Sequence, residues 1–143
     1  YIDGNRVGIV GHSYGGFMAA IGIVKYPDLF QAAVDRAGPT TWKNYDSIYT
    51  ERYMSLPQEN KEGYEKSTVM NYVDNLKGHL LIMHGLVDDN VHPTNAWQLI
   101  DALDKAGKQY ESRFFPTGTH GFGGYDTVMQ FFDKYLMETQ ESD

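Results

Sequence analysis

Short apolar runs alternate along the chain with longer stretches in which apolar residues recur at helical spacing. Four apolar runs have the length and composition of strands: 6–11, 30–37, 79–84 and 110–115. The run 6–11, which ends on a glycine, is expected to form a buried parallel strand. Helices are predicted for 14–26, 94–106 and 125–138, with one or two short helices within 59–76 and a long aromatic loop over 40–57. Strands separated by helices are typical of βαβ units. The pattern therefore predicts an α/β fold, with about four parallel strands flanked by helices.

The helix predicted over 94–106 shows this patterning clearly. Its core-facing stripe is expected to consist of Ala96, Leu99, Ile100 and Leu103. Gly107 stands where a helix commonly ends on a glycine with positive φ. In open parallel sheets the functional groups lie beyond the carboxyl ends of the strands, so the chemistry is expected in the loops that follow the strands.

Composition and charge exclude several classes of protein. The chain has 143 residues, which suits one domain with a hydrophobic core. Its 12 Lys and Arg against 19 Asp and Glu give a net charge of −7, so it lacks the basic surface of a nucleic-acid-binding protein. We expect no membrane segment, because no apolar run is long enough, and the opening Tyr-Ile-Asp-Gly-Asn-Arg does not predict a signal peptide. The absence of cysteine excludes disulfides, thiolate metal sites and a cysteine nucleophile.

A candidate nucleophile lies at the first strand–helix junction. Residues 11–15, Gly-His-Ser-Tyr-Gly, match the G-x-S-x-G elbow, which follows a strand and begins a helix. Ser13 would sit in a strained turn, and a Cβ at the flanking Gly11 or Gly15 would collide with the adjoining strand or helix. The backbone N–H of Tyr14 would point toward an oxyanion. The alternative is a glycine-rich strand–helix turn in which the serine is incidental.

A serine hydroxyl needs a positioned base, and the sequence offers a base and an acid in a suitable order. His120 follows the fourth predicted strand in a glycine-flanked loop. Asp88 and Asp89 follow the third strand. We choose Asp88 to orient His120, and we expect Asp89 to cap the loop or pair with a neighbour. The chain order Ser, Asp, His is that of α/β-hydrolases.

The other histidines have structural interpretations. His12 is the variable position of the elbow, His79 starts a strand, His84 ends one, and His92 caps the following helix. An alternative is that His84, Asp88, His92 and His120 collect a metal ion. The sequence has no pair of histidines four residues apart on one helix, and a metal site would leave the elbow serine unexplained. We therefore expect no metal.

With these residues in place, the chain resembles the prolyl oligopeptidase family, and within it the dipeptidyl peptidase IV branch. The matching segments are G-H-S-Y-G-G from Gly11, Y-D-S-I-Y-T-E-R-Y-M from Tyr45, S-T-V-M from Ser67, H-G-L-V-D-D-N-V-H from His84 and T-H-G-F from Thr119. They span almost the whole chain in the family's order. The T-E-R-Y-M segment is highly specific, whereas the elbow alone would not be.

The resemblance implies a role for each matching residue. Ser13, Asp88 and His120 match the catalytic triad, and Tyr14 matches the residue that gives an oxyanion N–H. The pocket for the penultimate proline is implied to be lined by Tyr14, Trp42, Tyr45, Tyr49 and Val91. Asn90 matches the asparagine that binds the carbonyl of the substrate's P2 residue. Flat aromatic faces pack well on a pyrrolidine ring, although ordinary loop packing would also gather such residues.

Two departures from the family pattern shape the expectations for this chain. The variable elbow position is His12, where the closest mammalian members carry tryptophan. The chain also lacks the family's upstream tyrosine, the second oxyanion donor, and its β-propeller with the acidic pair for the substrate's amine. We expect residues 1–143 to form a partial α/β-hydrolase fold, the C-terminal portion of a peptidase catalytic domain without the upstream half of its core and without the β-propeller. The strand at 6–10 would then lie at a lateral edge of the sheet and favour homo-oligomers.

The resemblance implies a serine exopeptidase that releases N-terminal Xaa-Pro or Xaa-Ala dipeptides in an exported parent protein. Its partner would be a peptide substrate with penultimate Pro or Ala, and no cofactor is implied. An acylaminoacyl-peptidase or a carboxylesterase on the same fold is the alternative enzyme. The alternative without an enzyme is an inactive, self-associating fragment of a catalytic domain.

Overall fold

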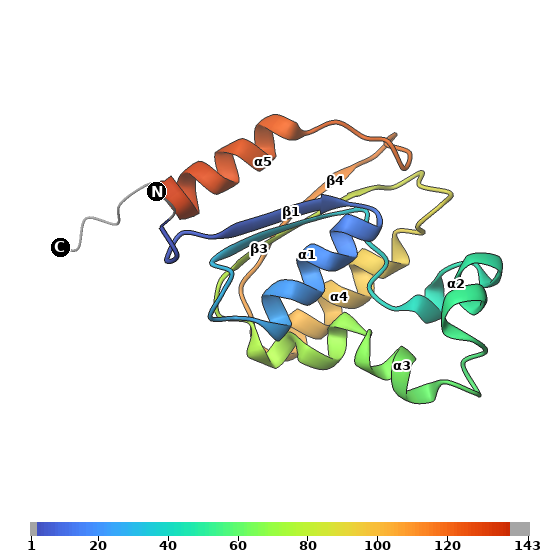
Figure 1. Cartoon of the computed structure of the whole chain (residues 1–143). Helices are drawn as coiled ribbons and strands as arrows, with labels where there is room; N and C mark the ends of the chain where they lie inside the picture. Colours follow the sequence, from blue (N-terminus) through green and yellow to red (C-terminus); the bar gives the residue numbers. More distant parts are fainter. Residues whose placement is uncertain (1–2, 138–143) are drawn as a thin grey trace.

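Within residues 3–137, which the computed structural model describes, four parallel strands form one sheet in the order β1-β2-β3-β4 (Figure 1). The strands are β1 (Gly8–His12), β2 (Ala32–Arg36), β3 (His79–Gly85) and β4 (Glu111–Phe115). Each strand pairs in parallel with the next along the chain, so all carboxyl ends meet at one end of the sheet. The four predicted strands and the α/β class are confirmed.

Helices cover both faces of this sheet (Figure 1). The α-helices of the described residues are α1 (Tyr14–Lys25), α2 (Ser47–Met54), α3 (Lys61–Lys66), α4 (Thr94–Lys105) and α5 (Tyr125–Phe132). There are also 3-10 turns η1 (Trp42–Asn44) and η2 (Val69–Asn75) and a π-helical turn η3 (Asp133–Met137). Figure 1 shows α1 and α4 on one face and α5 on the other, while α2 and α3 project beyond one end of the sheet. The last predicted helix is confirmed to residue 137, and its expected end at 138 lies outside the described residues.

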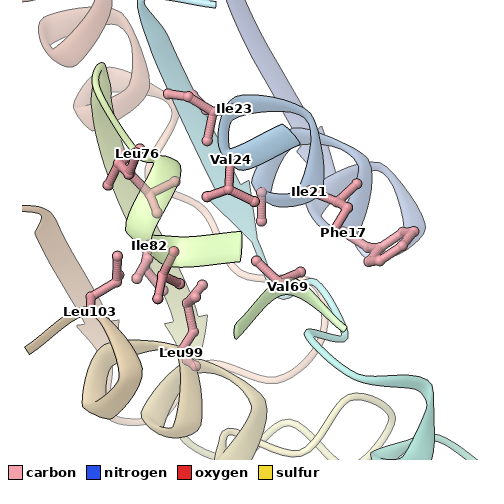
Figure 2. Close-up of a cluster of buried hydrophobic side chains, with 14 of the residues drawn as sticks. Phe17, Ile21, Ile23, Val24, Val69, Leu76, Ile82, Leu99 and Leu103 are labelled. Atoms are coloured by element: carbon pink, nitrogen blue, oxygen red, sulfur yellow. The ribbon is translucent and has the colours of Figure 1, made fainter. Parts of the chain in front are cut away.

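The face that carries α1 and α4 holds the larger core (Figure 2). Its sheet side chains come from alternate positions, Ala33, Leu80 and Ile82, as the twofold repeat of a strand requires. Leu99 and Leu103 of α4 are fully buried against them, and Ile100 is partly buried, so the predicted stripe is confirmed. After α4, Gly107 has φ +66°, as expected for a glycine that ends a helix.

The opposite face of the sheet packs on α5. The side chains between those of the first face, among them Val34, Leu81 and Met83, meet Val128 and Phe131 of α5. Both central strands are therefore buried on their two faces, which explains the unbroken apolar runs 32–34 in β2 and 80–83 in β3. This double burial gives the central strands and the loops after them a rigid support.

Two expectations differ from the structure. The segment 40–57, predicted as a loop, contains the helix α2, because the Asp46 side chain accepts the N–H of Tyr49 and caps its first turn. The run 6–11 was expected to form a buried strand. Its strand β1 instead alternates between exposed and half-buried residues, since β1 pairs with β2 alone at a lateral edge, where Val10 is 48% exposed.

None of the helices described over residues 3–137 combines the length and apolar character that a membrane span needs.

Candidate active site

The turn between β1 and α1 holds Ser13 in an unusual backbone conformation. Its φ of +59° lies in a region that side chains with a Cβ rarely adopt, and such strain gathers at functional turns. Its N–H donates to the carbonyl of Arg36 at 2.8 Å, and its own carbonyl accepts the N–H of Phe17 at 3.0 Å. Strand β2 and helix α1 thus fix the serine from two sides.

The glycines around Ser13 are not equally constrained. A Cβ on Gly11 would collide with the backbone of Gly15, as predicted, but a Cβ on Gly15 would meet no atom within 4 Å. The prediction for Gly15 is therefore wrong. Gly16 is the second crowded position, because its Cβ would lie 2.5 Å from Oδ1 of Asp35 and 2.8 Å from the carbonyl oxygen of Arg36. Close packing of α1 on β2 is what requires a glycine there.

Ser13, His120 and Asp88 lie in one chain of hydrogen bonds beyond the carboxyl ends of the strands. Nε2 of His120 is 3.0 Å from Oγ of Ser13, and Nδ1 of His120 is 2.8 Å from Oδ2 of Asp88. The three residues follow β1, β3 and β4, so the parallel sheet brings together side chains that are far apart in sequence. The arrangement can move a proton from a hydroxyl to an imidazole beside a carboxylate.

The Asp88 carboxylate is held by its own loop. Its Oδ1 accepts the N–H groups of Asn90 at 3.0 Å and Val91 at 2.9 Å, and the residue is only 3% exposed. Asp89 is exposed to solvent. The structure therefore places the carboxylate of Asp88, and not that of Asp89, against His120.

His84 contacts the loop that holds Asp88, a role that the sequence interpretation missed. It is 1% exposed, and its Nε2 lies 2.7 Å from the carbonyl oxygen of Val91 and 3.4 Å from Oδ2 of Asp88. Burial is the main reason that the pKa of His84 is lowered, so the ring is neutral and Nε2–H donates to Val91. A signal was present in the sequence, since a histidine stands four residues before the acid, near the end of the strand that precedes the loop.

The ring of His12 packs against the ring of His120. Their ring centres are 4.8 Å apart, and the His12 ring is 5.8 Å from that of Phe122. Burial, followed by the nearby His120 and Arg36, lowers the pKa of His12. A neutral His12 places an uncharged ring next to the imidazole of His120.

An aromatic pocket opens beside Ser13. It has a volume of about 150 Å³ and is lined by Ser13, Tyr14, Pro39, Trp42, Tyr45 and Tyr49. Trp42 and Tyr49 each meet Tyr45 edge to face, at 5.9 and 5.4 Å between ring centres. Pro39 is a lining residue that sequence interpretation missed, and its place after the second strand was the available signal.

Val91 was expected to line this pocket and Asn90 to bind the carbonyl of the substrate's P2 residue, and of the two only Asn90 is exposed. Val91 is fully buried and does not line the pocket beside Ser13. Asn90 is exposed, and its Oδ1 accepts the hydroxyl of Tyr45 at 2.8 Å. Burial raises the pKa of Tyr45, which keeps this phenol protonated as a donor. The Nδ2 group of Asn90 is therefore the end of the amide that remains for an external acceptor.

The alternative metal site is not assembled in the described part of the chain. Over residues 3–137, no three His, Asp or Glu side chains are placed to hold one ion. His92 turns to the next helix, where its Nδ1 accepts the N–H of Thr94 at 3.2 Å. His92 therefore acts at the start of α4, as predicted.

The sequence of the chain is similar to that of a known protein family. The sequence profile of the prolyl oligopeptidase family matches residues 1–139. Proteins named dipeptidyl-aminopeptidase B are 42% identical in Metarhizium robertsii and 45% identical in Arthroderma gypseum, over 94% and 96% of this chain. The chain spans only 15% and 16% of the length of these two relatives.

Solved structures give the same result at the level of the fold. A Bacteroides ovatus protein assigned as a dipeptidyl aminopeptidase IV matches 95% of this chain with a TM-score of 0.92 and 32% identity. Porphyromonas gingivalis dipeptidyl peptidase 4 matches 97% of it with a TM-score of 0.87 and 32% identity. In each case the match covers 20% of the solved chain.

Proposed function

The chain belongs to the prolyl oligopeptidase family, and from this premise we propose that it carries the catalytic residues of a serine exopeptidase. The observation that carries the proposal is the hydrogen-bonded series from Ser13 through His120 to Asp88, with distances of 3.0 and 2.8 Å. Its position after three strands of one parallel sheet is the one that an α/β-hydrolase uses.

Each residue has a defined role in this mechanism. His120 takes the proton from Ser13 as the hydroxyl attacks the scissile carbonyl, and then gives that proton to the leaving amine. Asp88 orients the imidazole and stabilises its positive charge. The N–H of Tyr14 lies at the first position of α1, where it has no acceptor within the helix, so it can donate to the oxyanion. Water then hydrolyses the acyl-enzyme by the same proton route.

The pocket beside Ser13 supports a preference for small, flat residues. A volume of about 150 Å³ walled by aromatic rings suits a pyrrolidine ring or a methyl group and disfavours longer side chains. We assign Nδ2 of Asn90 to the P2 carbonyl of the substrate, since Tyr45 already occupies its Oδ1. The proposed reaction is therefore release of N-terminal Xaa-Pro or Xaa-Ala dipeptides, in line with the names of the relatives.

A panel of three chromogenic substrates tests this proposal on the complete gene product. It consists of a Gly-Pro derivative with a free amine, an acetyl-Ala derivative and a short-chain ester. We expect the Gly-Pro derivative to give the highest kcat/KM and the Ser13→Ala variant to lose it. Preference for acetyl-Ala would indicate an acylaminoacyl-peptidase, and preference for the ester would indicate a carboxylesterase. Either result would overturn the exopeptidase assignment.

We further propose that residues 1–143 form the C-terminal part of a larger catalytic domain and that β1 pairs with a further strand. What supports this is the position of β1 at a lateral edge of the sheet, with Val10 48% exposed. An edge with unpaired backbone groups and apolar side chains invites pairing with another strand. For the isolated 143-residue chain, a second copy can supply that strand, which leads to self-association.

A further inference from the structure

Arg36 is a buried cation that contacts both the nucleophile turn and the loop of His120. It is the last residue of β2, and only 3% of its surface is exposed. Its backbone carbonyl accepts the N–H of Ser13 at 2.8 Å. Its side chain extends to the other end of the site, where Nη2 donates to the carbonyl oxygens of Phe122 at 2.9 Å and Gly123 at 2.8 Å.

Two aromatic rings fix the guanidinium in this position. Its central carbon lies 4.1 Å from the ring centre of Tyr125 and 5.1 Å from that of Phe122. A cation over an aromatic face is attracted to it, and more strongly where water is excluded. Arg36 therefore holds the loop through its carbonyls and also through the Phe122 ring.

Arg36 provides the polar contacts to one side of the His120 loop, where the buried ring of Phe122 also stacks on that of Phe115 at 4.8 Å between ring centres. Residues 116–124 join β4 to α5 without regular structure. Before His120, Phe115 and Gly118 accept the N–H groups of Leu86 and Val87, each at 2.9 Å. After His120, the hydrogen bonds that the described residues make to positions 121–123 come from Arg36. Gly121 and Gly123 restrict the backbone of residues 121–123 very little, so contacts with other segments must fix its position.

A buried guanidinium at this position has a cost in stability. No ion pair among the described residues involves Arg36, and its Nε is buried without a hydrogen-bond partner. An apolar side chain of similar length would fill the space without the loss of hydration. What the arginine provides, and an apolar side chain would not, is a donor to the carbonyl oxygens of Phe122 and Gly123.

We infer that Arg36 is a positioning residue that keeps His120 within hydrogen-bond distance of Ser13. It does so by joining the nucleophile turn to residues 121–123 of the His120 loop. The inference rests on the proposed roles of Ser13 and His120. It assigns Arg36 no contact with substrate, and Arg36 is not among the residues that line the pocket beside Ser13.

The rate at which a small fluorophosphonate labels Ser13 measures this positioning, because the reaction needs His120 but not the substrate pocket. In the complete gene product, Arg36→Met should slow labelling by about 100-fold, the scale of a misplaced catalytic group. Arg36→Lys should lose only about ten-fold, since an ammonium can reach the same carbonyls without the planar fit to the rings. Arg113→Met is the matched control: Arg113 is exposed on β4 and bonds to Thr127, and its loss should leave the rate unchanged.

A double-mutant cycle separates positioning from a general loss of structure. In a His120→Ala background, Arg36→Met should cause no further loss, because Arg36 acts through His120. An equal loss in both backgrounds, or an unchanged rate for folded Arg36→Met, would overturn the inference and leave the proposed function intact. Absence of Ser13 labelling in the unaltered protein would overturn the proposed function itself. If circular dichroism shows that Arg36→Met is unfolded, Arg36→Lys carries the same cycle.

Discussion

Nδ1 of His120 lies 2.8 Å from Oδ2 of Asp88, and the other oxygen of that carboxylate is occupied by two backbone N–H groups. The backbone bonds fix the plane of the carboxylate, so Oδ2 has a single direction in which to meet the imidazole. A buried carboxylate with this support can hold one tautomer of His120, with the proton on Nδ1 and Nε2 left to accept from Ser13.

Replacing Asp88 tests that arrangement against its neighbour. Asp88→Asn should lower kcat by about 1,000-fold or more, because an amide favours the wrong tautomer of His120. Asp89→Asn is the matched control and should have little effect, since Asp89 is exposed. Steady-state kinetics on the Gly-Pro substrate measure both. A larger loss for Asp89→Asn would show that the acid is wrongly assigned.

The aromatic wall of the pocket predicts a substrate-dependent effect. Tyr49→Ala should lower kcat/KM for the Gly-Pro substrate by an amount equivalent to roughly 1–3 kcal/mol, the scale of a lost apolar contact. A short-chain ester that does not fill the pocket should lose less. Ile48→Ala, at an 87% exposed position of the same helix, serves as the control. Equal losses on both substrates would assign Tyr49 to packing.

Asp35 predicts how stability changes with pH. Burial raises its pKa from the ordinary 3.8 to about 7, although the N–H of Gly38 opposes the shift. Between these values the folded protein holds a proton that the unfolded chain has lost, so the free energy of unfolding falls as pH rises. This penalty is absent below the unfolded pKa and complete above the folded one.

Asp35→Asn should remove the part of this pH dependence that comes from the carboxyl group. Urea unfolding at about pH 5, 6 and 8 should show that the variant gains stability relative to the unaltered protein as pH rises. The amide can still accept the N–H of Gly38. Parallel pH profiles for the two proteins would contradict a raised pKa at Asp35.

The lateral edge at β1 predicts the behaviour of the isolated 143-residue chain. Light scattering should find dimers or larger species, and Val10→Lys should shift them toward monomer, because a charge on an edge strand opposes pairing. Ile48→Lys, at an exposed site on α2, should not do so. A monodisperse monomer of the unaltered chain would contradict pairing through β1.

Much of the fold was predictable because its signals are local. The strands β2 and β3 are buried on both faces, so their apolar runs stand out, and the stripe of α4 follows from its spacing. Helix α2 was missed because its aromatic and β-branched residues have weak helix propensity, and its capping Asp46 was taken for part of a loop. The different constraints on Gly15 and Gly16 depend on the distance to Asp35, which only the packing of α1 on β2 sets.

The candidate site also has residues that the sequence predicted and residues that it did not. The chain order of Ser13, Asp88 and His120 predicted that they would meet, since each follows a strand of one parallel sheet. Arg36 could not be assigned from sequence, because its role depends on contacts with a segment far along the chain. Pro39 was missed although its place after the second strand was a signal, since only the fold shows which residues line the pocket. The catalytic roles of the first three residues and the substrate preference stay predictions.

Covalent labelling tests the role of Ser13 most directly. The complete gene product is treated with a small fluorophosphonate, and the modified residue is located by peptide mapping with mass spectrometry. One adduct on Ser13 is predicted, formed at a rate that drops by about 100-fold or more in His120→Ala, the scale of lost general-base catalysis. A folded protein that gives no adduct on Ser13, or one that labels Ser13 equally fast without His120, would contradict a nucleophile activated by this histidine.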